Sequence, residues 1–129
     1  MKFNVFKIGS QWGYKAYMDV ETKNVVFLMY SDPHEGGTLF ESHDGSESPE
    51  ILDLIKSRDT DLYERIMNIK SGVETMTLYA WFDNKGRRMT RSYEKYELEY
   101  SCYKKMFEDY RSYGYTLKPV HNEIETLDL

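Results

Sequence analysis

Apolar and polar residues alternate near the start of the chain with the period of two that β-strands require. Residues 14–21 show this alternation most clearly, and residues 3–8 predict an earlier strand. Residues 25–30 instead form a continuous apolar run, which is typical of a strand buried on both faces. We therefore expect an antiparallel meander with residues 25–30 as its central strand.

Two short helices are predicted after a polar stretch at residues 31–47, in which residues 38–40 form a brief strand or an anchor to the core. Ser48 and Pro49 provide an N-cap and a proline at the first helical position. Asp59 or Thr60 caps the second helix. Its apolar side chains recur at helical spacing, at Leu62, Ile66 and Ile69, and Gly72 marks its end. The two helices are expected to form an amphipathic hairpin.

A β-hairpin is predicted next, with strands at residues 76–82 and 87–92 and a turn at residues 83–86. Gly86 stands late in the turn, where a positive φ is required. The return strand is basic and offers only Met89 as an aliphatic side chain, a composition typical of an edge strand.

The longest helix is predicted over residues 93–113, because aromatic side chains recur there at helical spacing: Tyr96, Tyr100, Tyr103, Phe107 and Tyr110. Residues 115–118 predict a short strand that Pro119 ends. Residues 120–129 are expected to be an acidic, flexible tail.

These elements predict an α+β fold. We expect an antiparallel sheet, made of the N-terminal meander and the later hairpin, packed with a short helical hairpin and one longer tyrosine-rich helix. A chain of 129 residues with 40% hydrophobic and 30% charged residues suits a single globular domain, placed at residues 1–119 with the tail at 120–129.

Signals for secretion and for membrane insertion are absent from the sequence, so we expect a cytoplasmic protein without a membrane partner. Cys102 is the one cysteine, which excludes an intramolecular disulfide and a multi-cysteine zinc site. Its place among tyrosines in a helical pattern predicts a buried, inert thiol.

His34 and His43 lie in the polar stretch among acidic residues, so a small metal-dependent enzyme is one hypothesis. Their spacing matches no metal motif, however, and Gly36 and Gly37 lack the lysine or serine of a phosphate loop. Nucleophile, kinase and dinucleotide signatures are also absent. We therefore expect no catalytic residue, no metal and no cofactor.

A basic, aromatic cluster marks the predicted hairpin: Lys85, Arg87, Arg88 and Arg91 near Trp81 and Tyr93. Guanidinium groups beside stacking rings suit single-stranded nucleic acid or a nucleotide. A charged, solvated edge strand would have the same composition.

Residues 32–61 are acidic, with only Lys56 and Arg58 as basic residues. Such a surface can engage a basic groove by placing carboxylates where phosphates would lie, and the candidate contacts are Glu41, Asp44, Glu47, Asp59 and Asp61. Acidic residues at helix starts also arise from the helix dipole alone.

The leading hypothesis from the sequence is a small non-enzymatic protein-binding module. We expect an inhibitor or regulator that occludes a groove on a nucleic-acid-handling partner, by compositional analogy with phage-type anti-defence proteins such as an anti-CRISPR. Direct binding of nucleic acid by the basic hairpin is the alternative. The oligomeric state is left open.

Overall fold

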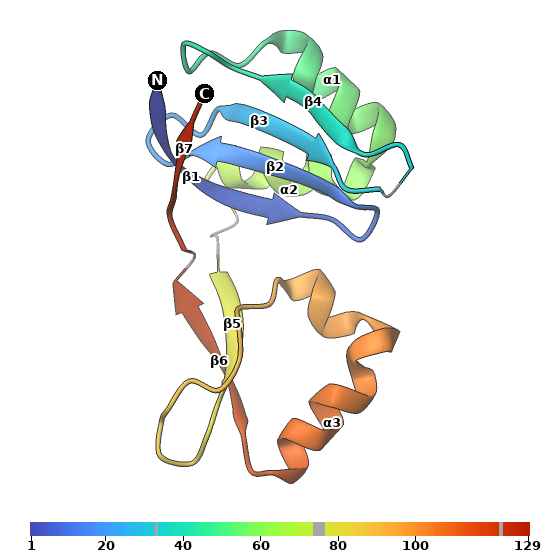
Figure 1. Ribbon diagram of the computed structural model, residues 1–129, viewed down its shortest axis with the longest axis vertical. Helices are drawn as coiled ribbons and strands as arrows, with labels where there is room; N and C mark the ends of the chain where they lie inside the picture. Colours follow the sequence, from blue (N-terminus) through green and yellow to red (C-terminus); the bar gives the residue numbers. More distant parts are fainter. Residues whose placement is uncertain (33, 74–76, 122) are drawn as a thin grey trace. The chain divides into compact units, whose positions relative to one another are not determined.

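The computed structural model has an α+β fold, as the sequence predicts, and describes residues 1–32, 34–73, 77–121 and 123–129. Contacts divide the chain into two compact units (Figure 1). Unit 1 comprises Met1–Thr75 and Glu123–Leu129, and unit 2 comprises Met76–Asn122. The boundary expected after residue 119 does not coincide with this division, because residues 116–121 belong to unit 2 and residues 123–129 to unit 1.

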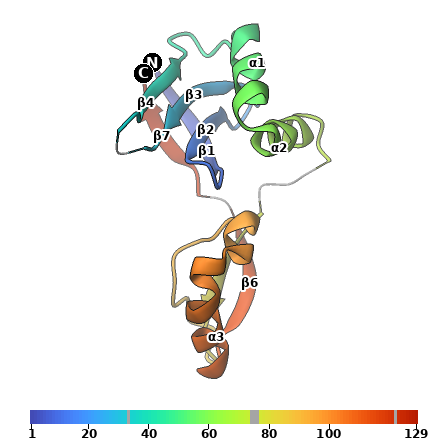
Figure 2. The same ribbon diagram turned by 90° about the vertical axis from the view of Figure 1, so that its right-hand side faces the viewer.

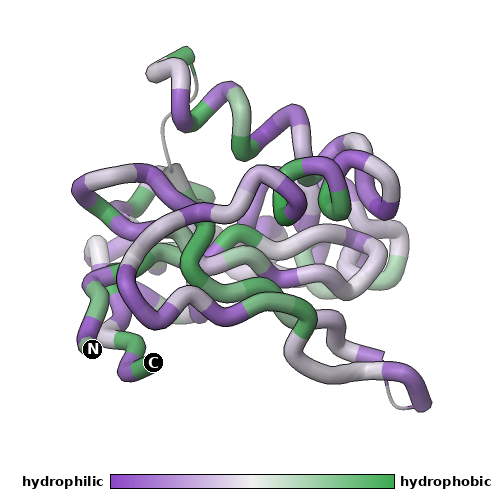
Figure 3. The backbone as a smooth tube through the Cα atoms, turned by 90° about the horizontal axis from the view of Figure 1, so that it is seen from above, coloured by the Kyte–Doolittle hydropathy of each residue, from purple (hydrophilic) through white to green (hydrophobic). Residues whose placement is uncertain are grey.

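Unit 1 is built on a five-stranded antiparallel sheet with the order β4-β3-β2-β1-β7. Its strands are β1 (Lys2–Gly9), β2 (Tyr14–Asp19), β3 (Val25–Tyr30), β4 (Gly37–Glu41) and β7 (Glu125–Asp128). The predicted meander is confirmed, but β2 and not β3 lies in the middle, because β7 extends the sheet beyond β1. The apolar run of β3 is part of the continuous hydrophobic stretch drawn in green in Figure 3.

Two helices, α1 (Pro49–Arg58) and α2 (Thr60–Lys70), lie on one face of this sheet (Figures 1 and 2). Their inward side chains are buried together with those of the facing strands: Ile51, Ile55, Leu62 and Ile66 with Ile8, Ala16, Met18 and Leu28. Pro49 begins α1 as predicted, although the Ser48 hydroxyl makes no capping hydrogen bond. Asp59 does cap α2, where its Oδ1 accepts a hydrogen bond from the backbone N–H of Leu62 at 3.1 Å.

Residues 125–128 form a strand where a flexible tail was expected. Strand β7 pairs with β1 in antiparallel register, and the backbone N–H of Leu129 donates to the carbonyl oxygen of Met1 at 2.9 Å. Leu127 and Leu129 also pack against a second apolar cluster formed by Phe3, Val5 and Val26. This pairing partner lies at the other end of the chain, so no local pattern could indicate it.

In unit 2, β5 (Thr77–Phe82) pairs with β6 (Thr116–His121) and not, as predicted, with residues 87–92. The predicted start of this strand, at Met76, lies outside the described residues. Residues 87–93, here called the basic leg, run along the other side of β5 and meet it at two isolated bridges, Phe82 with Arg88 and Tyr79 with Tyr93. The turn before the leg is confirmed, because Gly86 has a φ of +79°.

Pro119 lies inside β6 and does not end it. It stands opposite Tyr79, whose N–H and carbonyl both bond to Tyr93 on the basic leg, at 2.9 and 2.6 Å. Tyr79 therefore makes no ladder hydrogen bond toward β6, and the missing N–H of Pro119 points away from β5. A proline at such a position leaves the pairing intact.

The predicted long helix is interrupted. Two 3₁₀ helices, η1 (Lys95–Glu99) and η2 (Ser101–Tyr103), precede α3 (Lys104–Ser112), and Tyr100 is extended with a ψ of 126°. A capping box between Glu94 and Glu97 begins η1 separately. Helical spacing predicts which rings are neighbours. It does not reveal that two short 3₁₀ helices, the first with its own capping box, take the place of the first part of the predicted helix.

Aromatic residues form the core of unit 2. Trp81, Tyr93 and Phe107 are buried, and their partly buried neighbours are Leu98, Tyr103, Met106, Tyr110, Tyr115 and Leu117. The ring centroids of Trp81 and Phe107 lie 5.7 Å apart, and those of Tyr93 and Phe107 lie 5.2 Å apart. Cys102, expected to be buried, lies in η2 and is exposed.

Phe107→Ala should destabilise unit 2 by about 3 kcal/mol, because it empties an aromatic site that is 3% exposed. Tyr113→Ala, at a ring that is 64% exposed, should change stability by less than about 0.5 kcal/mol and serves as the control. Urea denaturation in a Trp12→Phe background, followed by the fluorescence of Trp81, measures both. Equal midpoints for the Phe107 variant and the parent would contradict this assignment of the core.

Candidate functional site

The turn that begins the basic leg is held by Asp83. Its carboxylate accepts hydrogen bonds from the backbone N–H groups of Lys85 and Arg87 and forms an ion pair with the Arg87 guanidinium at 2.7 Å. The backbone N–H of Arg87, followed by the Arg87 side chain and the Lys85 N–H, lowers the pKa of Asp83 below its ordinary value despite burial. The Arg87 side chain is 69% exposed, so Arg87 is paired but accessible.

The basic leg bulges away from β5 after Met89. The N–H of Met89 donates to the Trp81 carbonyl oxygen at 2.8 Å, but the N–H of Trp81 donates to the Thr90 hydroxyl at 3.0 Å and not to a backbone oxygen. The regular exchange of backbone hydrogen bonds resumes only between Tyr79 and Tyr93. Thr90, Arg91 and Ser92 therefore form a bulge that turns the Arg91 side chain toward η1 and η2.

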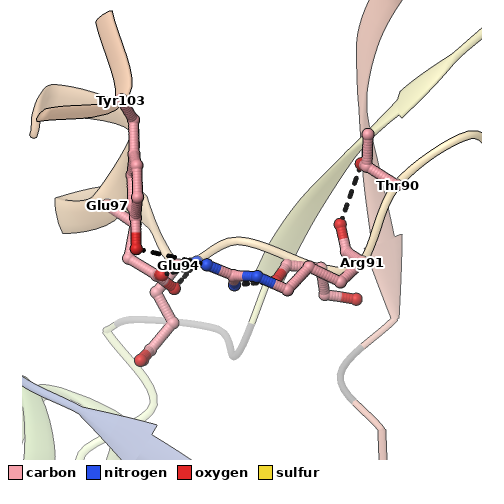
Figure 4. A network of polar contacts seen from close by, with 6 residues as sticks. Thr90, Arg91, Glu94, Glu97 and Tyr103 are labelled. Carbon is pink, nitrogen blue, oxygen red and sulfur yellow. Dashed lines mark hydrogen bonds and ion pairs between the residues drawn. The ribbon is translucent and has the colours of Figure 1, made fainter. Parts of the chain in front are cut away.

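Arg91 joins the leg to the aromatic core. Its guanidinium lies over the Tyr93 ring, 4.1 Å from the centroid, and its Nη2 donates to Glu97 at 2.9 Å and to the Tyr103 hydroxyl at 3.5 Å (Figure 4). Burial lowers the pKa of Arg91, but the hydrogen bond and charge of Glu97, with smaller contributions from Tyr93 and Tyr103, outweigh it, so the pKa lies above its ordinary value. Arg91 is therefore a structural cation.

The two rings that the sequence suggested as stacking platforms lie inside the core. Trp81 is 1% exposed and Tyr93 is 4% exposed. Both face α3, and the Arg111 guanidinium lies 5.4 Å from the Trp81 ring centroid. Neither ring is accessible to a base, which corrects the hypothesis that they form an exposed binding surface with the arginines.

Lys85 in the turn and Arg87, Arg88, Met89 and Arg91 on the leg are exposed. Arg88 also holds the bulge, since its Nε donates to the Thr90 carbonyl oxygen at 2.9 Å and its Nη2 to the Ser92 hydroxyl at 2.7 Å. Tyr103, which Arg91 contacts, begins a row of partly exposed rings that continues with Tyr100 and Tyr96. The sequence assigned these three rings to the core side of a helix. All three belong to the set of aromatic residues that recur at helical spacing in residues 93–113. That spacing alone could not show which of the rings reach the surface.

The five acidic candidates fall into two groups. Glu41, Asp44 and Asp61 are exposed, at the end of β4, in the loop after it and in the first turn of α2. Glu47 instead accepts a hydrogen bond from the N–H of Val25 at 2.6 Å and pairs with Lys70 at 2.9 Å. Asp59 is 3% exposed and caps α2. The carboxylates of Glu47 and Asp59 therefore stabilise the fold. Neither belongs to the accessible acidic surface.

Asp44 lies in a loop that is ordered by hydrogen bonds. Its Oδ1 accepts from the Ser46 hydroxyl at 2.6 Å, the Ser46 N–H at 3.0 Å and the Ser42 hydroxyl at 3.3 Å. These bonds, led by that of the Ser46 hydroxyl, lower the pKa of Asp44 below its ordinary value. An open hollow of about 340 Å³ lies here, lined by Phe40, Glu41, Ser42, His43, Asp44, Ser46 and Ser48.

His34 and His43 are both exposed, and β4 lies between them in the chain. A strand of five residues spans roughly 13 Å, whereas the ligands of one metal ion lie within about 4 Å of one another. No group of three or more potential metal ligands occurs in the part of the chain that the structure describes. Within the same residues, no helix is long and apolar enough to cross a membrane.

The two units carry net charges of opposite sign. Unit 1 contains sixteen acidic and eight basic residues and has a net charge of −8, whereas unit 2 contains six acidic and nine basic residues and has a net charge of +3. No protein family model matches this chain, and no curated protein or solved structure shows significant similarity to it. The geometry and charge of each unit are therefore the guide to its function.

Asp83→Asn should weaken the dependence of unit 2 stability on pH. Because the folded-state pKa of Asp83 lies below 3.8, its stabilising contribution is complete above that value and is lost as the pH falls through the folded pKa. In a Trp12→Phe background, Trp81 alone reports unfolding, since the chain has two tryptophans. Between neutral and acidic pH, the parent should lose more stability than the variant.

Asp109→Asn is the control for this experiment, because Asp109 forms an exposed pair with Lys105. Its loss should leave the pH profile close to that of the parent. Identical profiles for the parent and the Asp83 variant would show that this carboxylate does not stabilise the turn through its charge.

Proposed function

We propose that this protein is a non-enzymatic binding module whose acidic unit 1 docks on a basic surface of a partner protein. The main support is the distribution of charge. Residues 24–55 contain no lysine or arginine and seven acidic residues: Asp32, Glu35, Glu41, Asp44, Glu47, Glu50 and Asp53. A surface of this kind accelerates encounter with a basic partner and suppresses binding to acidic ones.

The carboxylates are presented by ordered elements. Glu47 ties the loop after β4 to the start of β3 and to the end of α2, through Val25 and Lys70. Ser42 and Ser46 hold Asp44 within that loop. Because these contacts already restrict the loop, a partner would lose little conformational entropy in ordering it. The lowered pKa of Asp44 lets its carboxylate stay charged to lower pH than an ordinary aspartate.

A basic groove that normally holds nucleic acid is the partner surface that this arrangement suits. Such a groove binds phosphates through lysine and arginine, and exposed carboxylates can occupy the same positions. The protein would then act as an inhibitor or regulator that occludes the groove of a nucleic-acid-handling protein. Glu41, Asp44 and Asp61 are the accessible members of the predicted contact set.

Reversing Glu41, Asp44 and Asp61 to Lys should slow association with the partner by about ten-fold or more and remove most of its salt dependence, because exposed charges act mainly on the association rate. The partner is first isolated from the native host with the parent protein, identified by mass spectrometry and purified. Stopped-flow or surface binding at several salt concentrations then measures the rates.

Glu21, Glu108 and Glu125, all exposed, provide a matched triple reversal with the same change in net charge. An equal loss in this control would show that only the total charge matters. Unchanged association in the first triple variant would exclude its three carboxylates as the interface.

A further inference from the structure

Three partly exposed tyrosines form a continuous row on unit 2, here called the tyrosine ladder: Tyr96, Tyr100 and Tyr103. Their ring centroids are 5.6 Å apart between Tyr96 and Tyr100 and 5.5 Å apart between Tyr100 and Tyr103. The extended backbone of Tyr100, between η1 and η2, places the three rings in contact. Eight of the twelve tyrosines belong to unit 2, which concentrates this residue type there.

The inner end of the ladder packs against the core of unit 2. Tyr103 contacts Phe107 with a centroid distance of 5.8 Å, and Phe107 is buried against Trp81 and Tyr93. Aromatic side chains that are already held by packing offer contact area at a low cost in conformational entropy. The rings can therefore serve as a platform without first becoming ordered.

Arg91 lies beside the ladder, where its guanidinium contacts Tyr103. The exposed cations Lys85, Arg87 and Arg88, in the turn and the first part of the leg, lie farther along β5, because Arg88 bridges Phe82 whereas Tyr93 bridges Tyr79. Two exposed lysines flank the row in sequence, Lys95 before Tyr96 and Lys104 after Tyr103. Glu97 is paired with Arg91, and unit 2 as a whole carries a charge of +3.

We propose that unit 2 binds single-stranded nucleic acid, with bases stacked on the tyrosine ladder and phosphates held by the flanking lysines and the basic leg. Stacking platforms beside cations are the general means of binding single strands without sequence preference, because every base has a π-face. A duplex keeps its bases stacked inside and cannot use the rings. An acidic peptide can use the cations but offers no bases to the ladder.

This site differs from the one suggested by sequence, since the accessible rings are not those of Trp81 and Tyr93. Its residues all belong to unit 2, which carries a net charge of +3, whereas the −8 charge of unit 1 opposes the approach of a nucleic acid. We expect modest, strongly salt-dependent affinity.

The test is fluorescence anisotropy of the full chain with a labelled oligothymidine of roughly 16 nucleotides. Tyr100→Ala should raise the dissociation constant about ten-fold, the effect of losing one stacked base, whereas Tyr100→Phe should bind like the parent because the ring remains. Trp12→Ala, at an exposed ring of unit 1 (62% exposed), is the matched control and should have no effect.

Charge and stacking are separated by two further comparisons. The double variant Lys95→Gln, Lys104→Gln should reduce the slope of log affinity against log salt by about 0.7 per cation removed. Glu99→Gln, which removes an exposed acid next to Tyr100, should tighten binding. An abasic oligonucleotide of equal length should bind about ten-fold more weakly than oligothymidine.

Circular dichroism establishes that each variant is folded. If Tyr100→Ala unfolds, Tyr96→Ala and the lysine variants decide the outcome. Equal affinity for the abasic strand, for polyglutamate and for oligothymidine would overturn the proposal in favour of a general anion-binding surface. Absence of binding, or equal binding by the parent and the ladder variants, would also overturn it. None of these results bears on association through Glu41, Asp44 and Asp61.

Discussion

The backbone of β5 organises unit 2, because its two sides bond to different partners. Tyr79 and Trp81 direct their backbone groups to the basic leg, while Leu78, Ala80 and Phe82 pair with β6. This alternation is the ordinary pattern of an antiparallel strand. It explains why Pro119 is tolerated within β6 and why the leg can bulge at Arg91 without disturbing the β5 and β6 pair. The position of Arg91 over Tyr93 and against Glu97 follows from that bulge.

The second constraint is the separation of charge between the units. Unit 1 has a net charge of −8 and unit 2 of +3, although the chain as a whole has only −5. At physiological salt each charged side chain acts over roughly 8 to 10 Å, so a ligand responds to the charges nearest its own contact and not to the total. A protein arranged in this way can bind a basic partner with one unit and an anion with the other. The overall charge is therefore a poor guide to either activity.

Several elements could be predicted because their signals are local. The alternation of β2, the proline at the start of α1, the Asp59 cap of α2 and the glycine of the turn at residues 83–86 each depend on neighbours within a few residues. Strand β7 and the pairing of β5 with β6 join distant segments, and no pattern along the chain indicates such partners. The break at Tyr100 depends on a capping box that competes with a continuous helix.

The sequence by itself determined the α+β class, most helices and strands, and the division into acidic and basic stretches. Residue periodicity and charge are properties of the chain, so they survive any arrangement of its parts. Tertiary structure decided which of the charged and aromatic residues are accessible. Glu47 and Asp59 became structural carboxylates, and Trp81 and Tyr93 became core rings. Tyr96 and Tyr100 remained partly exposed, since burial depends on which elements pack together and not on the residue type alone.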